Sequence, residues 1–398
     1  MPREVRNEGR LSPRAMRLPP FGIRKVYEAA VAMERQGIEV IHLELGRPDF
    51  DTPAHIKDAA IRAINEGQVH YTSNMGLLQL REAIAQKLLA QHGLEYDPHE
   101  EIFVTVGGSE ALMVTFAAIL SDGDGIVVPV PGYTTYFSLP VFWGAEVIPV
   151  RCSEESGYQL DVRDLEKSLT SNAKAIMVNS PCNPTGAVWD RNTMEGVARV
   201  ALDRDMVVIS DEVYETLAYD GAEVVSPAAL PGMRERTLII NSISKTYSAT
   251  GWRVGYVAGP ARLVQAAYRV HQHNVASANT FAQWGAVAAL EGPQDDVERM
   301  VSAFDERRRY LHDALQGIPG LACHRPQGAF YMFPNTSAFG MSSEELTMYL
   351  LREAKVAVVH GTAFGPAGEG HVRISYASSM ENLRAAVERL AEALSRLG

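Results

Sequence analysis

Several polar residues in the middle of the chain stand directly after short apolar segments, and their types suggest one kind of chemistry. Lys245 comes shortly after the apolar segment LIIN and Ser242. Asp211 follows MVVIS, and Tyr214 and Arg253 stand a few residues after Asp211 and Lys245. Lysine is seldom buried without a chemical task, and a desolvated lysine amine attacks carbonyl groups. A carboxylate can keep a ring nitrogen protonated, and the planar guanidinium of arginine suits a phosphate.

Other segments end in motifs that fit the same chemistry. Gly108-Ser109-Glu110 follows EIFVTV and opens a predicted helix, whose free N–H groups and dipole attract anions. Tyr133 follows GIVVPV through Pro-Gly, and Asn183 opens an Asn-Pro-Thr-Gly motif after AIMVN. Each motif also has a structural interpretation, as a tight strand–helix turn, a turn tyrosine, a proline turn, or, for Asp211, a helix cap. Their succession at strand ends favours one site for a planar, phosphorylated, nitrogen-containing cofactor.

These motifs must be positioned by strands and helices that alternate along the chain. Helices are expected between several strands, for example over Ser109–Leu120 and Arg191–Arg204. The alternation predicts an α/β fold with a mostly parallel, helix-covered sheet, in which ligands bind at the carboxyl ends of the strands. The short, β-branched segments predicted as strands buried on both faces are Glu101–Val106, Gly125–Val130, Ala145–Val150, Ala175–Asn179, Met206–Ser210, Leu238–Asn241 and Val254–Ala258.

The two ends of the chain predict a second, smaller α+β domain. Ile23–Gln36 has a helical pattern and Val40–Leu45 an extended one, while the C-terminal part mixes amphipathic helices with the short segments GAFYMFP, VAVVHG and HVRISYA. We therefore expect an N-terminal arm over residues 1–20, a small domain over 21–50 and 296–398, and a large cofactor-binding domain over 51–295.

Composition narrows the class of protein further. The 398 residues are 46% hydrophobic and 21% charged, as in ordinary globular proteins, and the net charge of −11 argues against binding to nucleic acid or anionic membranes. The three cysteines form no CxxC pair or Cys/His cluster, so we expect neither disulfides nor a metal site. No apolar stretch suggests a membrane span or a secretion signal, and a cytoplasmic location is expected.

Longer motifs carry a family resemblance. LGRPDFDTP, VTVGGSEAL, NSPCNPTGAV, SDEVY, SISKTYSATGWRVGY and HVRISYA occur in this order. From about Pro20 onward, the chain resembles the class I/II family of fold-type I pyridoxal-phosphate aminotransferases, especially the aspartate and aromatic branch. The resemblance implies a large domain with a seven-stranded, mostly parallel sheet between helices, a smaller α+β domain, and pyridoxal 5′-phosphate as cofactor. It implies transfer of an amino group from an L-amino acid to a 2-oxo acid by ping-pong chemistry. Cyclases, lyases and oxidases of specialised amino-acid metabolism share the scaffold and remain an alternative.

The resemblance also implies roles for residues around the cofactor ring. Lys245 matches the lysine that forms the internal aldimine and then carries the proton as general base and acid. Asp211 matches the carboxylate that faces the pyridine nitrogen, so that the ring accepts electrons. Tyr214 and Asn183 match donors to the phenolic oxygen of the ring, and Tyr133 matches the aromatic side chain that stacks on its face.

The same resemblance implies which residues bind the cofactor phosphate and that the protein forms a homodimer. The phosphate is expected on the backbone and side chains of Gly108, Ser109 and Glu110, and on Ser242 and Arg253. In this family a tyrosine matching Tyr71 reaches the phosphate of the neighbouring subunit, which implies a homodimer with shared active sites.

The substrate end of the site is matched only in part. Arg373 matches the arginine that binds the substrate α-carboxylate, with Gly46 and Asn183 beside it. Arg47 stands where relatives commonly carry an acidic residue, and no residue matches the second arginine of dicarboxylate-specific members. His271 and its neighbours lie near where a relative places residues that read the substrate side chain. The resemblance therefore leaves the amino donor open.

Overall fold

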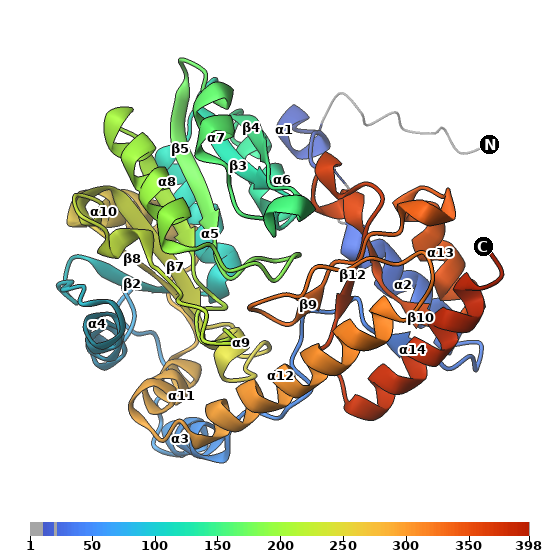
Figure 1. Cartoon of the computed structure of the whole chain (residues 1–398). Coiled ribbons are helices and arrows are strands. Elements are labelled where there is room, and N and C mark those ends of the chain that lie inside the picture. The colour runs from blue at the N-terminus through green and yellow to red at the C-terminus, as the bar shows by residue number, and fades with distance from the viewer. Residues whose placement is uncertain (1–10, 20–21, 398) are drawn as a thin grey trace, which may run out of the picture.

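The computed structural model describes residues 11–19 and 22–397. Most of the arm expected over residues 1–20 therefore lies outside the described residues. Its described part contains the short helix α1 (Pro13–Met16), and Arg14 Nη2 lies 3.1 Å from Asp122 Oδ2. Figure 1 shows a larger unit on the left and a smaller one on the right, with the helix α12 (Asp295–Gln316) running between them.

The larger unit is built on a seven-stranded sheet of order β2-β8-β7-β6-β5-β3-β4. Strand β8 is antiparallel to both of its neighbours, and the remaining neighbours pair in parallel. The prediction of a mostly parallel α/β sheet is confirmed. The strands are β2 (Ile102–Thr105), β3 (Gly125–Val130), β4 (Glu146–Arg151), β5 (Ala173–Asn179), β6 (Val207–Asp211), β7 (Thr237–Ser242) and β8 (Gly255–Ala258).

Alternation along the strands produces two separate apolar layers. In β3, Ile126 and Val128 pack in one cluster, whereas Val127 packs in another. Successive side chains of a strand point to opposite faces, so both faces of the sheet are covered. The helices of this unit are α3 (Ala54–Asn65), α4 (Leu78–His92), α5 (Gly107–Ile119), α6 (Thr135–Phe142), α7 (Val162–Ser168), α8 (Arg191–Asp203), α9 (Ile243–Thr246), α10 (Ala261–Asn274) and α11 (Thr280–Glu291).

The smaller unit combines both ends of the chain. Strand β1 (Ile41–His42) pairs in parallel with β10 (Val356–Ala357), which brings the N-terminal segment into the C-terminal α+β unit. A second sheet has the order β11-β12-β9 and is antiparallel. The domain bounds at residues 50 and 296 stay a prediction. The other elements of this unit are α2 (Gly22–Glu34), β9 (Tyr331–Met332), α13 (Ser343–Glu353), β11 (Val359–His360), β12 (Val372–Ser375) and α14 (Met380–Leu394).

Among residues 11–19 and 22–397, no helix is both long enough and apolar enough to span a membrane.

Candidate active site

One pocket collects most of the residues that the sequence singled out. It lies at the carboxyl ends of the central strands, where Asp211 ends β6 and Ser242 ends β7. Residues from the smaller unit close its other side. The sequence-predicted residues that line it are Gly46, Gly108, Ser109, Tyr133, Asn183, Asp211, Tyr214, Ser242, Lys245, Arg253 and Arg373.

Lys245 lies in the short helix α9, which directly follows β7. Its Nζ donates a hydrogen bond to the backbone oxygen of Gly46 over 2.6 Å. Burial, and then the positive charges of Arg373 and Arg253, lower the pKa of Lys245 to about 8. A neutral, nucleophilic amine is therefore accessible near physiological pH.

Asp211 is buried and held by a residue that sequence reasoning missed. Tyr136 donates a hydrogen bond from its hydroxyl to Asp211 Oδ2 over 2.7 Å, and the Val213 N–H lies 3.3 Å from Oδ1. Burial raises the pKa of Asp211 to about 6, and the hydrogen bond from Tyr136 opposes that rise. Such a carboxylate is stabilised by a cationic partner in the pocket. Tyr136 lies in the first turn of α6, and this helix was not predicted, so the sequence offered no reason to direct its side chain to Asp211.

A second missed residue, Tyr331, joins Tyr214. Their hydroxyl oxygens lie 2.9 Å apart and both side chains are buried. Tyr214 comes from the turn after β6, whereas Tyr331 belongs to β9 of the smaller unit. A Cβ atom at Gly46 would lie 2.1 Å from the Tyr331 hydroxyl, so only glycine fits there. The motif QGAFYMFP contains Tyr331, but nothing in its pattern indicates which aromatic ring faces the pocket.

One group of residues that line the pocket is suited to bind an anion. The N-terminus of α5 brings Gly108 and Ser109 there, and Ser242 and Arg253 line the same pocket. Arg253 has φ +56°, and its guanidinium donates to the Thr250 oxygen over 3.0 Å. A Cβ at Gly107 would lie 2.4 Å from Arg253 Nη2, so this glycine lets the guanidinium approach the helix end. Helix N–H groups and a guanidinium together suit a phosphate.

Arg373 supplies a second anion site within the pocket. It lies on β12 and is 1% exposed. Its Nη1 donates to Asn183 Oδ1 over 3.0 Å, its Nη2 donates to the backbone oxygen of Glu44, and its guanidinium lies over the Tyr331 ring at 4.4 Å. Burial lowers the pKa of Arg373. The fixed guanidinium can receive a carboxylate through two parallel hydrogen bonds.

Comparison with known proteins decides the family. The model of the family aminotransferase class I and II matches residues 38–390. The chain belongs to this family. It is 42% identical to an aspartate aminotransferase of Pyrococcus abyssi over 94% of this chain and 96% of that protein. It is 40% identical to aromatic-amino-acid aminotransferase 2 of Thermococcus litoralis, over 96% and 98% of the two chains. The structure of a Thermus thermophilus aspartate aminotransferase with maleate superposes with a TM-score of 0.92, at 40% identity, over 96% of this chain and 99% of that one.

The enzyme is therefore an aminotransferase, and its cofactor is pyridoxal phosphate. The pocket fits this cofactor by its own chemistry. Ser109, Ser242 and Arg253 offer a phosphate site, Asp211 offers a buried carboxylate for a protonated ring nitrogen, and Lys245 offers an amine of lowered pKa. The expectation of an aminotransferase with a mostly parallel sheet of seven strands is confirmed.

Glu110 is placed differently from the expectation. Its side chain points away from the pocket of the aminotransferase: Oε1 accepts from His271 Nδ1 at 2.9 Å and from Asn274 Nδ2 at 3.1 Å, and Oε2 accepts from the Val106 N–H at 2.5 Å. Helix phase explains this, because consecutive residues of α5 face different directions. The prediction that the Glu110 side chain holds the phosphate is wrong, whereas the expected role of the Glu110 backbone stays a prediction. His271 is likewise buried beside Glu110 and does not line the pocket.

Tyr71 also lies outside the pocket of its own chain. It is 86% exposed and borders a surface hollow with His70 and Thr280-Phe281. Arg47 is exposed as well. The role of Tyr71 in a neighbouring subunit stays a prediction.

Proposed function

We propose that this aminotransferase moves the amino group of an L-amino acid to a 2-oxo acid, with Lys245 as the group that carries the proton. The observation that supports this most directly is the meeting of Lys245, Asp211 and Arg373 in one pocket. Both classes of substrate carry an α-carboxylate beside the reacting carbon. A single guanidinium can therefore orient each of them in turn, as a two-step exchange requires.

The ring of the cofactor is positioned by residues of the larger unit. Asp211, fixed by Tyr136, would face the ring nitrogen and keep it protonated. Tyr133 would stack on the ring face, and Tyr214 and Asn183 would donate to its phenolic oxygen. When bound, pyridoxal phosphate supplies an electron sink for the negative charge that develops at the substrate Cα. Ser109, Ser242 and Arg253 would hold its phosphate.

In this proposal, Lys245 carries the proton that leaves the substrate Cα. With its pKa lowered to about 8, the amine accepts a proton from the substrate Cα and later donates it again. Arg373 and Asn183 would fix the carboxylate, so that the Cα–H bond is directed toward Lys245 Nζ. Lys245 already contacts the Gly46 oxygen, which lies on the substrate side of the pocket.

The proposal includes assembly and location. Tyr71 is 86% exposed, which suits a residue that contacts another subunit. In the proposed homodimer it would complete the phosphate site of the neighbouring subunit. Cys152, Cys182 and Cys323 are free thiols, which suits the reducing cytoplasm.

A half-reaction tests the proposal and identifies the amino donor. The holoenzyme is mixed with each L-amino acid in the absence of any oxo acid, and the 2-oxo acid and ammonia released are measured. Transamination forms about one oxo acid per active site and then stops, because the amino group stays on the enzyme. A lyase or oxidase would continue and release ammonia with every turnover, and that result would overturn the proposal.

A further inference from the structure

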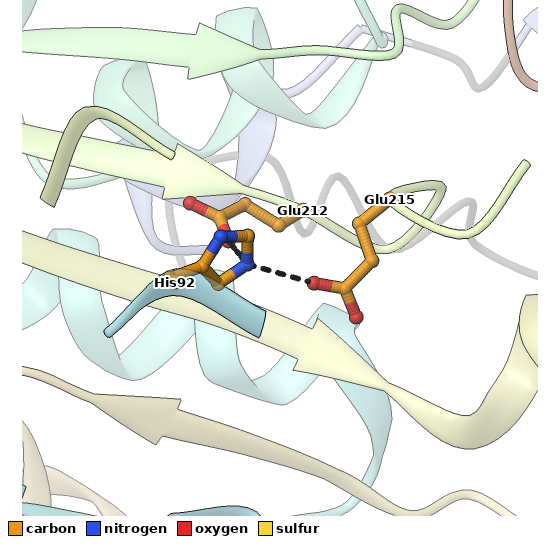
Figure 2. A group of neighbouring side chains, drawn as sticks. All are labelled: His92, Glu212 and Glu215. Atoms are coloured by element: carbon orange, nitrogen blue, oxygen red, sulfur yellow. Dashed lines mark ion pairs between the residues drawn. The ribbon is translucent and has the colours of Figure 1, made fainter. Parts of the chain in front are cut away.

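The His92 side chain and the carboxylates of Glu212 and Glu215, more than a hundred positions later in the sequence, meet outside the active-site pocket. His92 ends α4, Glu212 directly follows β6, and Glu215 lies in the turn after it. Their side chains are 10%, 3% and 5% exposed. His92 Nε2 lies 3.9 Å from Glu212 Oε2 and 3.6 Å from Glu215 Oε2, and Figure 2 shows the imidazole ring directed between the two carboxylates.

The facing atoms have no other partners. Within residues 11–19 and 22–397, His92 Nε2, Glu212 Oε2 and Glu215 Oε2 are buried and make no hydrogen bond. A buried polar atom without a partner destabilises the fold, and three such atoms aimed at one point indicate something that binds them together.

The rest of each carboxylate is fixed by hydrogen bonds. Glu212 Oε1 accepts from Ser210 Oγ at 2.8 Å and from Ser226 Oγ at 2.7 Å. Glu215 Oε1 accepts from Asn241 Nδ2 at 2.7 Å and from the ammonium of Lys87. These bonds hold the two Oε2 atoms in place toward His92, as outer partners do for the ligands of metal ions.

The distances suit a shared cation better than a direct hydrogen bond. Separations of 3.6 and 3.9 Å are too long for an N–H···O bond. A tetrahedral ion about 2.0–2.2 Å from each of its donors places those donors roughly 3.3–3.6 Å apart, which the 3.6 Å separation meets and the 3.9 Å separation exceeds by about 0.3 Å.

We propose that His92, Glu212 and Glu215 bind a first-row divalent metal ion of the zinc type. One imidazole and two carboxylates suit Zn²⁺, whereas Mg²⁺ and Ca²⁺ prefer oxygen ligands alone. The ion would tie the end of α4 to the segment that begins with Asp211, so its role is to stabilise the fold.

This site departs from the expectation that the chain binds no metal. That expectation rested on the spacing of the cysteines, and His92 lies far from Glu212 in sequence. The packing of α4 against β2 of the sheet brings them together.

The test uses tag-free holoenzyme and Zn²⁺ itself. The protein is treated with a chelator, dialysed against a small excess of Zn²⁺ without amino acids, and analysed for bound metal and for Tm. We expect about one Zn²⁺ per chain and a rise in Tm, because a ligand that binds only the folded state stabilises it. Mg²⁺ at the same concentration should produce neither effect.

A matched pair of variants locates the metal. His92→Gln removes a proposed ligand, and His99→Gln changes an exposed histidine nearby. We expect His92→Gln to weaken Zn²⁺ binding by more than roughly 100-fold, since loss of an outer partner alone costs about 10–100-fold. His99→Gln should bind as the unmodified enzyme does. Equal binding by both variants, or no Zn²⁺ on the unmodified enzyme, would overturn the proposal.

X-ray absorption at the zinc edge tests the site even where His92→Gln does not fold. The unmodified protein should show only nitrogen and oxygen neighbours, at about 2.0–2.2 Å. Sulfur neighbours would place the metal on a cysteine and contradict the assignment.

Discussion

Tyr136 and Asp211 form a buried hydrogen bond of 2.7 Å on the floor of the active-site pocket. The two residues come from different elements, α6 and β6. Burial raises the pKa of Asp211 to about 6, and the hydroxyl of Tyr136 acts in the opposite direction. Tyr136 thus helps to keep a charge on the carboxylate that we propose to face the cofactor ring.

Tyr136→Phe removes this donor and little else. A hydrogen bond to a charged group contributes about 1.5–3 kcal/mol, so we expect the affinity for pyridoxal phosphate to fall roughly 10- to 100-fold. The pKa of Asp211 should rise further, which moves the acid limb of the kcat profile to higher pH. Equilibrium dialysis and the pH profile measure both effects.

A control is Tyr96→Phe, because the buried Tyr96 hydroxyl makes no hydrogen bond to any described residue. Equal losses of cofactor affinity in Tyr136→Phe and Tyr96→Phe would contradict the role given to Tyr136.

Lys245 makes the stability of the cofactor-free protein depend on pH. Its pKa falls from 10.5 in the unfolded chain to about 8 in the fold. Its contribution to stability is therefore complete above pH 10.5 and is lost as the pH falls through about 8. The loss is on the order of 3 kcal/mol, since one pKa unit corresponds to about 1.4 kcal/mol.

Lys245→Met should therefore raise the Tm of the cofactor-free protein at pH 7 and abolish its activity. The gain in Tm should shrink as the pH approaches 10.5, the pKa of the unfolded lysine. Lys167→Met, at a lysine whose side chain is 75% exposed, serves as control and should change Tm little at either pH. A gain for Lys245→Met that does not change with pH would refute the pKa argument.

Arg373→Lys tests the assignment of the substrate carboxylate. Lysine cannot reproduce the bidentate geometry, and loss of a buried, hydrogen-bonded charge pair costs about 2–5 kcal/mol. We expect kcat/KM for amino acids to fall by roughly 30-fold or more. Amines without an α-carboxylate, offered as donors, should react about equally with both enzymes. A similar loss for both kinds of donor would show that Arg373 does not bind the carboxylate.

Glu110→Ala should affect stability rather than the cofactor. Glu110 accepts hydrogen bonds from the buried His271 and the exposed Asn274, and their loss leaves the buried His271 donor unpaired at a cost of about 1–3 kcal/mol. The free energy of unfolding measured in urea should fall by this amount. The affinity for pyridoxal phosphate should stay within about 2-fold, because the Glu110 side chain lies outside the pocket. Glu100→Ala, at an exposed position, should change neither quantity. If Glu110→Ala greatly weakened pyridoxal phosphate binding and left stability unchanged, the Glu110 side chain would hold the phosphate after all.

Mixed dimers test the position of Tyr71. Tyr71→Ala and Lys245→Ala chains are each expected to have little activity alone. In a hybrid of the two, one site would carry both defects and the other none. Random mixing should therefore restore about a quarter of the unmodified activity. Mixtures no more active than their components would place Tyr71 outside the neighbouring site.

The sequence alone was sufficient to predict the strands and the chemical types of the residues that line the pocket. The seven strands were predicted because short β-branched segments and their Gly, Pro and Asn boundaries are local signals. Lys245 and Asp211 were found because parallel strands bring their carboxyl ends to one edge, so that residues after successive strands meet. Arg253 reaches the same edge because it stands just before β8, whose first residue pairs with Ser242 at the end of β7.

Only the tertiary structure decided where several side chains point. Tyr136 reaches Asp211, and Glu110 turns to His271, because helix phase and packing set the direction of a side chain. Tyr331 meets Tyr214 across the two units, and His92 meets Glu212 through the packing of α4 on the sheet. These contacts join residues distant along the chain, and their geometry depends on how whole elements pack rather than on any local pattern.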